Sequence, residues 1–183
     1  MFRTVFFATQ MQPILATERL TLALLTLLDS DFIRELVNSK GWLDFIGERH
    51  VHSPEEALVY CQKIVDSKTV TYWVVTQKEQ GIPIGIVTLI KRDYLDHHDI
   101  GFAFLPAYNG HGYAYEAAKA VLDELWLHDD HEQMLATTLP ENTHSTRLLT
   151  KLGFGFDKEI RVNDDRLLLF KRASEKPIPL SNG

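Results

Sequence analysis

The sequence predicts one domain of mixed α and β structure, with helices packed around a single sheet. At 183 residues, the chain can build one sizeable core but is too short for two ordinary domains. Segments whose apolar residues recur at every second position also alternate along the chain with segments of helical spacing. The apolar content of 45% and charged content of 24% are typical of a soluble globular protein and exclude disorder over most of the length.

The first half of the chain should begin with a strand and two helices. Leucines alternate with smaller residues over 20–24, the period of a half-buried strand. N-cap candidates at 29–31 precede a helical apolar face. Another helix starts at Ser53, where Pro54 takes the first helical position and Glu56 completes a capping box. Its buried face is expected to comprise Ala57, Leu58, Cys61, Ile64 and Val65.

The second half should contain most of the strands. β-Branched and aromatic residues predict a hairpin whose turn ends at Gly81, and a closing hairpin should turn at 163–165. One helix is expected after Gly112 and another over about 142–152. The six strands are predicted at 71–76, 84–90, 99–104, 134–139, 154–160 and 166–171.

Charge and cysteine content exclude several classes of function. The formal net charge of −6 argues against nucleic acid as a partner, because nucleic-acid binders neutralise phosphates with a basic surface, but it suits a cationic acceptor such as an amine. The one cysteine, Cys61, cannot form an internal disulfide and should fill the core in a reducing compartment. We expect no signal peptide and no membrane partner, because no uncharged apolar run approaches about 20 residues. The expected location is the cytoplasm.

Two glycines at the mouth of a helix form the most informative segment. Gly110 and Gly112 have no Cβ, so the backbone can turn tightly and expose N–H groups where the helix dipole favours an anion. A diphosphate is the natural occupant, and His111 can add a cationic donor. The helix that follows can lie close against the sheet, because one face carries Ala114, Ala117, Ala118, Val121, Leu122 and Leu125.

A Gly-x-Gly pair alone is equally consistent with a plain turn. A dinucleotide fingerprint would need a third glycine where Tyr115 stands, and the Gly-Lys-Ser/Thr ending of a P-loop is absent. Both of these nucleotide motifs are therefore disfavoured, and neighbouring blocks of sequence must decide.

Three blocks together resemble the GCN5-related N-acetyltransferase family. Residues 109–117 read Asn-Gly-His-Gly-Tyr-Ala-Tyr-Glu-Ala and look like its acyl-CoA pyrophosphate loop. Residues 140–154 are similar to its later motif, in which an asparagine and a serine open a helix that ends at Gly-Phe. Residues 16–22 resemble the first strand of the branch that contains the ribosomal-protein N-terminal (alanine/serine) acetyltransferases. The blocks keep the family's order.

The resemblance implies the family's fold and domain limits. That fold is a strongly twisted mixed sheet whose central parallel strands splay apart around the cofactor, flanked here by about four helices. It would span residues 14–171, between an N-terminal extension of 1–13 and a loose tail of 172–183.

The cofactor implied by this resemblance is acetyl-CoA, with CoA as product. The pantetheine arm would pair with backbone groups of Ala103, Phe104 and Leu105, although ordinary pairing within the sheet is the plainer interpretation. Asn142 would contact pantetheine, serve as an N-cap, or do both. The loop residues implied are Asn109, Gly110, His111, Gly112, Tyr113 and Ala114. Ala107 stands at the first position of the longer loop pattern, where the family often has Gln or Arg, so the cofactor contact there should come from backbone groups.

The catalytic residues implied are Ser145 and Asp99. Leu149 stands where many members carry a tyrosine acid, so by default Ser145 would protonate the departing thiolate; otherwise it is an exposed helical serine. Asp99 can accept the amine proton through a water, or be a solvated strand end. An α-amine, with a pKa of about 8, asks less of a base than a lysine does.

Eight histidines raise the question of a metal, but none lies in a recognised ligand pattern. The candidates are 128–131, 97–99, and His50 with His52, and we expect no metal. His50 and His52 are more typical of a surface than of an acceptor site. Trp42 and Phe45 can wall the acceptor pocket, although core packing is the stronger expectation.

The leading function is direct attack of a primary amine on the thioester of acetyl-CoA. The alternatives are a non-catalytic acyl-CoA-binding domain, motivated by the missing tyrosine, and an unrelated nucleotide-binding domain. The acceptor is a small-molecule amine or a protein N-terminus, which the branch resemblance favours. A monomer or a homodimer is expected, since the final hairpin can expose an edge for a second copy.

Overall fold

The computed structural model describes residues 15–128 and 131–174, and these surround one eight-stranded sheet in the order β1-β2-β3-β4-β5-β6-β8-β7. Neighbouring strands are antiparallel except β5 and β6, which run parallel. The strands are β1 (Leu15–Ala16), β2 (Leu20–Leu24), β3 (Val70–Gln77), β4 (Ile82–Ile90), β5 (Asp99–Phe104), β6 (Gln133–Thr138), β7 (Gly155–Val162) and β8 (Asp165–Ala173). The predicted mixed sheet is confirmed.

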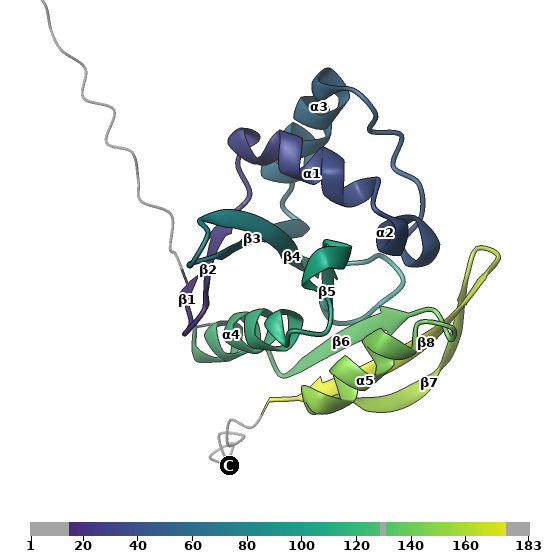
Figure 1. Ribbon diagram of the computed structural model, residues 1–183. Coiled ribbons are helices and arrows are strands. Elements are labelled where there is room, and N and C mark those ends of the chain that lie inside the picture. The colour runs from purple at the N-terminus through teal and green to yellow at the C-terminus, as the bar shows by residue number, and fades with distance from the viewer. Residues whose placement is uncertain (1–14, 129–130, 175–183) are drawn as a thin grey trace, which may run out of the picture.

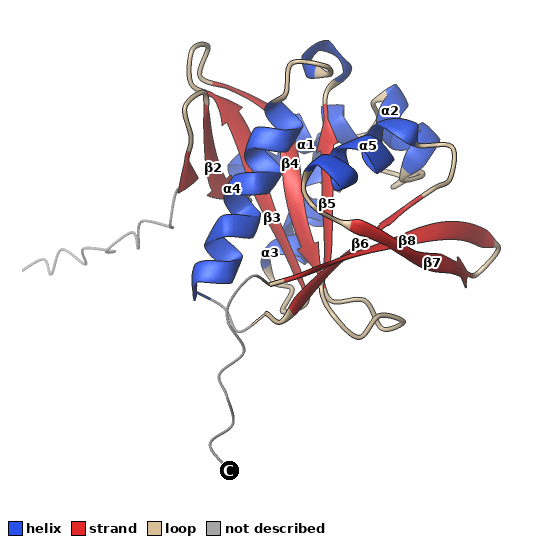
Figure 2. Cartoon of the chain, turned by 90° about the horizontal axis from the view of Figure 1, so that it is seen from below, coloured by secondary structure: helices blue, strands red, loops and turns tan. Residues whose placement is uncertain are grey.

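Helices cover the sheet in two groups, as Figures 1 and 2 show. The α-helices are α1 (Ser30–Val37), α2 (Lys40–Phe45), α3 (Pro54–Val65), α4 (Tyr113–His128) and α5 (Thr143–Lys151). Two short 3₁₀ turns are η1 (Leu27–Asp29) and η2 (Pro106–Tyr108). Side chains of α1, α2 and α3 pack in one cluster with Val74 and Ile86, whereas α4 and α5 share another with Val75 and Val87. Successive residues along β3, and along β4, therefore point to opposite faces of the sheet, one toward each group of helices.

The α3 start forms as predicted. The Ser53 hydroxyl accepts a hydrogen bond from the Glu56 backbone N–H at 3.1 Å, and the Glu56 carboxylate accepts one from Ser53 N at 2.9 Å. Two of the five residues expected on its buried face, Leu58 and Val65, are instead 44% and 47% exposed. Three residues of this helix reach the core, namely Ala57, Cys61 and Ile64.

Other element boundaries also differ from expectation. The short β1 and α2 were not predicted, since two and six residues give too little periodicity to recognise. Strand β8 continues to Ala173, because its last residues pair with the start of β6, so the loose tail does not begin at residue 172. The N-terminal extension of 1–13 lies outside the described residues, as does most of the tail. Within the described part of the chain, no helix is long and apolar enough to cross a membrane.

The sheet forks between β5 and β6. The two strands are in register only at Asp99 and Leu135, where Leu135 N–H donates to the His98 carbonyl at 2.9 Å. Beyond this point β5 keeps pairing with β4 while β6 pairs with β8, so the two parallel strands diverge toward their carboxyl ends. The segments after β5 and after β6 therefore begin at the same, open side of the sheet.

Candidate active site at the fork of the sheet

The closed end of the fork is held by the buried side chain of Asp99. Its carboxylate accepts hydrogen bonds from Thr137 N–H at 3.0 Å and from the Thr137 hydroxyl at 3.2 Å, and it forms an ion pair with Arg92. Burial raises the pKa of the Asp99 carboxyl group, while Arg92 and Thr137 favour its charged form. The expectation of a solvated strand end is wrong, since Asp99 is 3% exposed. These contacts occupy the Asp99 carboxylate, so its role here is structural, whereas a general base would need an accessible carboxylate.

Hydrogen-bond directions along β5 decide which backbone groups face the open end. Leu105 N–H donates to the Ile84 carbonyl of β4, whereas the His98 carbonyl accepts from β6, each at 2.9 Å. Because these directions alternate along a strand, odd-numbered residues face β4 and even-numbered residues face the fork. Of the three residues predicted for pantetheine, only Phe104 turns its N–H and C=O toward the fork. Ala103 and Leu105 face β4, whereas Phe102, which was not among the predicted residues, also faces the fork.

The Phe104 ring lies against a glycine on the neighbouring strand. Gly85 stands opposite Phe104 in the β4–β5 register. A Cβ added at Gly85 would lie 2.4 Å from Phe104 Cδ1 and 2.7 Å from the Ala103 carbonyl oxygen. Glycine at this position therefore leaves the space that the Phe104 ring occupies against β4.

The glycine loop connects β5 to α4 at the open end. Gly110 and Gly112 have φ values of 80° and 82°, a region that side chains with a Cβ disfavour. No atom lies within 4 Å of a Cβ built on Gly110, so the loop is open on that side. His111 Nδ1 lies 3.0 Å from the Asn109 carbonyl, and the His111 ring stacks on Tyr113 at 5.9 Å. Helix α4 begins directly after this loop, and the first N–H groups of a helix, which have no partner within the helix, suit an anion.

Residues 17–19 support this loop, a contact that was not predicted from the sequence. The Glu116 carboxylate in α4 accepts hydrogen bonds from the Thr17 hydroxyl at 2.6 Å and from Arg19 Nε at 2.7 Å. Arg19 Nη1 also donates to the His111 carbonyl at 3.0 Å. The signal was present in the matching blocks at 16–22 and 109–117, but nothing in their spacing showed that they touch.

Helix α5 begins after β6 on the same side of the fork. Asn142 caps it, because its Oδ1 accepts from Ser145 N–H at 3.1 Å; the N-cap interpretation is thus confirmed. Ser145 and Leu149 are four residues apart and share one helix face. Leu149 is only 1% exposed, whereas Ser145 is partly exposed and its hydroxyl has no hydrogen-bond partner among the described residues. Ser145 is therefore a partly exposed hydroxyl one helical turn before the buried Leu149.

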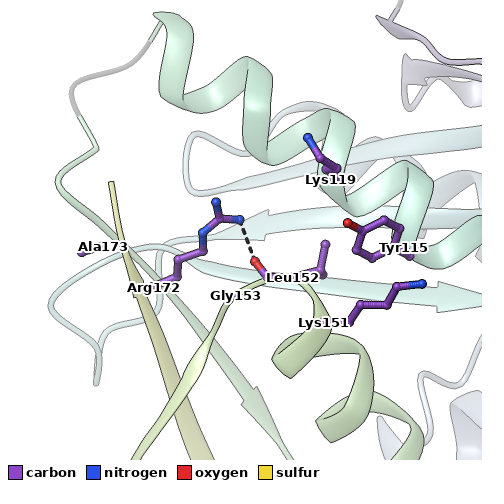
Figure 3. Close-up of a pocket in the computed structure, with 7 residues that line it drawn as sticks. All are labelled: Tyr115, Lys119, Lys151, Leu152, Gly153, Arg172 and Ala173. Carbon is purple, nitrogen blue, oxygen red and sulfur yellow. Dashed lines mark hydrogen bonds between the residues drawn. The ribbon is translucent and has the colours of Figure 1, made fainter. Parts of the chain in front are cut away.

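A basic pocket of about 350 Å³ lies between α4 and the end of α5 (Figure 3). Lys151 Nζ stands 4.3 Å above the Tyr115 ring, and Arg172 Nη1 donates to the Leu152 carbonyl at 2.6 Å. Lys119 belongs to α4 and lines the opposite side of the pocket. Tyr115 is three residues beyond Gly112, so this pocket begins about one turn of α4 away from the glycine loop.

One group of potential metal ligands occurs among the described residues. The ligand atoms of Glu48, His50 and His52 lie within 4.8 Å of one another, but all three side chains are exposed. Hydrogen bonds from the backbone of His50 and then of Arg49 lower the pKa of Glu48 despite its partial desolvation. Trp42 is buried in the core, as the stronger expectation held, and Phe45 is partly buried.

Comparisons with known proteins agree with this geometry. A family model described as an acetyltransferase (GNAT) domain matches residues 19–155. A Bacillus subtilis protein named as an uncharacterized N-acetyltransferase, YnaD, is 29% identical over 148 residues, which cover 79% of this chain and 86% of the relative.

Solved structures with different acceptors share the fold. A ribosomal-protein-S5-alanine acetyltransferase from Vibrio fischeri superimposes with a TM-score of 0.75 at 19% identity, over 92% of this chain and all of that one. A spermidine N-acetyltransferase from Vibrio cholerae, in complex with CoA and spermine, gives a TM-score of 0.74 at 21% identity, over 87% of this chain and 98% of the other. Because the family model covers well over half of the sequence, the chain belongs to the GNAT family of N-acetyltransferases, whose acetyl donor is acetyl-CoA.

Proposed function

We propose that this enzyme binds acetyl-CoA in the fork between β5 and β6 and transfers the acetyl group directly to a primary amine. The observation that carries the proposal is the convergence of three parts at one open end: the glycine loop after β5, the Phe104 backbone, and the Asn142–Ser145 turn after β6. The fit is chemical as well as spatial. Backbone N–H groups at a helix start suit a diphosphate, and unpaired strand groups suit the amides of pantetheine.

Each part of the fork has a distinct task in this proposal. Gly110 and Gly112 shape the loop so that N–H groups up to Ala114 meet the diphosphate. The Phe104 N–H donates to the thioester oxygen, where such a donor contributes about 3 kcal/mol as negative charge develops. The Ser145 hydroxyl donates a proton or a hydrogen bond to the departing sulfur. Acetyl-CoA supplies an activated acyl carbon, so no covalent enzyme intermediate is required.

In this scheme, Asp99 is not needed to accept the proton of the amine. Both Asp99 oxygens are already bonded at the closed end of the fork. An α-amine, with a pKa of about 8, is partly neutral near pH 7 and can lose its second proton to water. This chemistry favours a protein N-terminal α-amine as the acceptor class. The fold likeness to a ribosomal-protein alanine acetyltransferase supports the same class, whereas the likeness to the spermidine enzyme keeps a polyamine as the second candidate.

The acceptor class is tested by thiol release from acetyl-CoA with a matched panel of amines. The panel contains peptides that begin with alanine or serine, the same peptides with a blocked α-amine and one free lysine, and spermidine. We expect the free α-amine peptides to be the best acceptors. Faster turnover of spermidine would establish the second candidate. Binding of CoA without turnover of any amine would instead support a non-catalytic acyl-CoA-binding domain.

A further inference from the structure

An ion pair joins the turn between β1 and β2 to the first turn of α4. The guanidinium of Arg19 meets the Glu116 carboxylate through Nε at 2.7 Å and through Nη2 at 2.6 Å. The second carboxylate oxygen accepts from the Thr17 hydroxyl and from Arg19 N–H, at 2.6 and 2.9 Å. The Glu116 side chain is 18% exposed, so this two-point pair lies partly out of water. Residues almost a hundred positions apart are thereby locked together.

The same guanidinium also holds the glycine loop. Arg19 Nη1 donates to the His111 carbonyl at 3.0 Å, and the Arg19 guanidinium carbon lies 4.5 Å from the centre of the Tyr113 ring. A trans peptide points its C=O and its N–H in opposite directions. Fixing the His111 carbonyl toward Arg19 therefore aims the N–H of Gly112 away from it, toward the exposed side of the loop.

We propose that Arg19 is a positioning residue for the cofactor loop, which it holds through Glu116 and the His111 carbonyl. The inference rests on the proposed function in one respect, namely that the loop binds the diphosphate of CoA. A different role is direct contact between Arg19 and the diphosphate, since Arg19 Nη2 would lie 3.5 Å from a Cβ on Gly112. The two roles require opposite behaviour of Glu116.

Calorimetric titration with CoA separates the two roles. Positioning predicts that Arg19→Ala and Glu116→Ala each weaken CoA binding about tenfold, that the double variant is little worse than either single one, and that Thr17→Val weakens binding about threefold. Direct contact predicts that Glu116→Ala leaves binding unchanged or tightens it, because Arg19 is then released toward the ligand; this result would overturn positioning. The matched control is Arg166→Ala, which removes an exposed 2.7 Å ion pair with Glu159 in the last hairpin and should leave binding unchanged.

A donor comparison tests whether the effect acts through the diphosphate. S-Acetylpantetheine carries the thioester but no diphosphate, so Arg19→Ala should lower kcat/KM for acetyl-CoA about tenfold, through KM, and change it little for S-acetylpantetheine. An equal loss with both donors would mean general damage to the fold and would overturn the proposal. If the unaltered protein failed to bind CoA, the proposed function would fail first, independently of any Arg19 variant. Circular dichroism and melting curves identify any variant that does not fold, and Thr17→Val provides the mildest alternative.

Discussion

The two ends of the fork between β5 and β6 differ in how their polar groups are used. At the closed end, the side chains of Asp99, Arg92 and Thr137 saturate one another and join the two strands. At the open end, Phe104 turns its backbone N–H and C=O away from β4, and the Ser145 hydroxyl has no partner within the described residues. The comparison shows that pairing between β5 and β6 stops beside a buried ion pair, so the backbone of β5 is not paired with β6 toward its carboxyl end.

The largest expected effect comes from placing charge in the open end. Gly112→Asp should weaken CoA binding by at least about a hundredfold, because a carboxylate would stand where the diphosphate binds and a side chain would strain a φ of 82°. Calorimetry and the CoA-induced rise in melting temperature measure this loss.

Gly112→Asn separates charge from strain, because asparagine has nearly the same shape without the charge. It should retain much of the binding that the aspartate variant loses, and His111→Ala should cost less than either. Equal CoA stabilisation of the aspartate variant and the parent would remove the loop from the site.

A substitution at the closed end of the fork should lower the stability of the folded protein. Asp99→Ala should lower the free energy of unfolding by about 3 kcal/mol, because it leaves the Arg92 charge and two Thr137 donors without their partner. Urea denaturation measures the change. The control is Asp31→Ala, whose 82% exposed side chain pairs with Arg34 on the surface of α1 and should contribute little. If the two variants were equally stable, Asp99 would not hold the fork, and its predicted role as the base would deserve a direct test.

A chemical change at the open end should affect turnover alone. Ser145→Ala should lower kcat roughly ten- to a thousandfold with little change in acetyl-CoA affinity, because the sulfur gains charge only as the thioester bond breaks. The loss is limited, since a thiolate with a pKa of about 8.5 can leave without full protonation. Thr150→Ala, on an exposed part of the same helix, is the control. An unchanged rate with chemistry limiting would refute the assignment, and lower affinity instead would make Ser145 a binding residue.

The smallest predicted effect is a dependence of stability on pH through Glu116, in the first turn of α4. Burial tends to raise the pKa of Glu116, but hydrogen bonds from Thr17 and Arg19 outweigh it and the pKa is lowered overall. A carboxyl group with a lowered folded pKa stabilises the protein above its unfolded pKa, and that stabilisation is lost as pH falls through the folded value. The melting temperature of Glu116→Gln should thus lie below that of the parent at pH 7, and the gap should close below about pH 4. A gap that stayed constant with pH would argue against a charged Glu116 in the folded state.

Local features of the site could be predicted, and features set by distant partners could not. The glycine loop, the Ser53 capping box and the Asn142 cap each depend on residues within a few positions, so their side chains specify them. The direction of the Phe104 backbone depends on which strand pairs with β5, so the sequence alone could not show that Ala103 and Leu105 face β4. A solvated strand end was one of the two interpretations of Asp99, because its partners Arg92 and Thr137 meet it only in the folded sheet.

The contact between the first block and the loop was missed for the same reason. Arg19 and Glu116 are 97 residues apart, and no local pattern links them. Both lie in segments that resemble the family, but resemblance gave each segment a role without placing one beside the other. Only the folded sheet brings the turn after β1 against α4.

A crystal structure of the complex with CoA would show where the cofactor binds. We expect diphosphate oxygens to accept hydrogen bonds from backbone N–H groups between His111 and Ala114, and the pantetheine amides to pair with the Phe102 or Phe104 backbone inside the fork. The thiol should lie on the side of the fork where Ser145 presents its hydroxyl. CoA bound entirely in the basic pocket lined by Lys119, Lys151 and Arg172, with no part of it between β5 and β6, would overturn the proposed binding site.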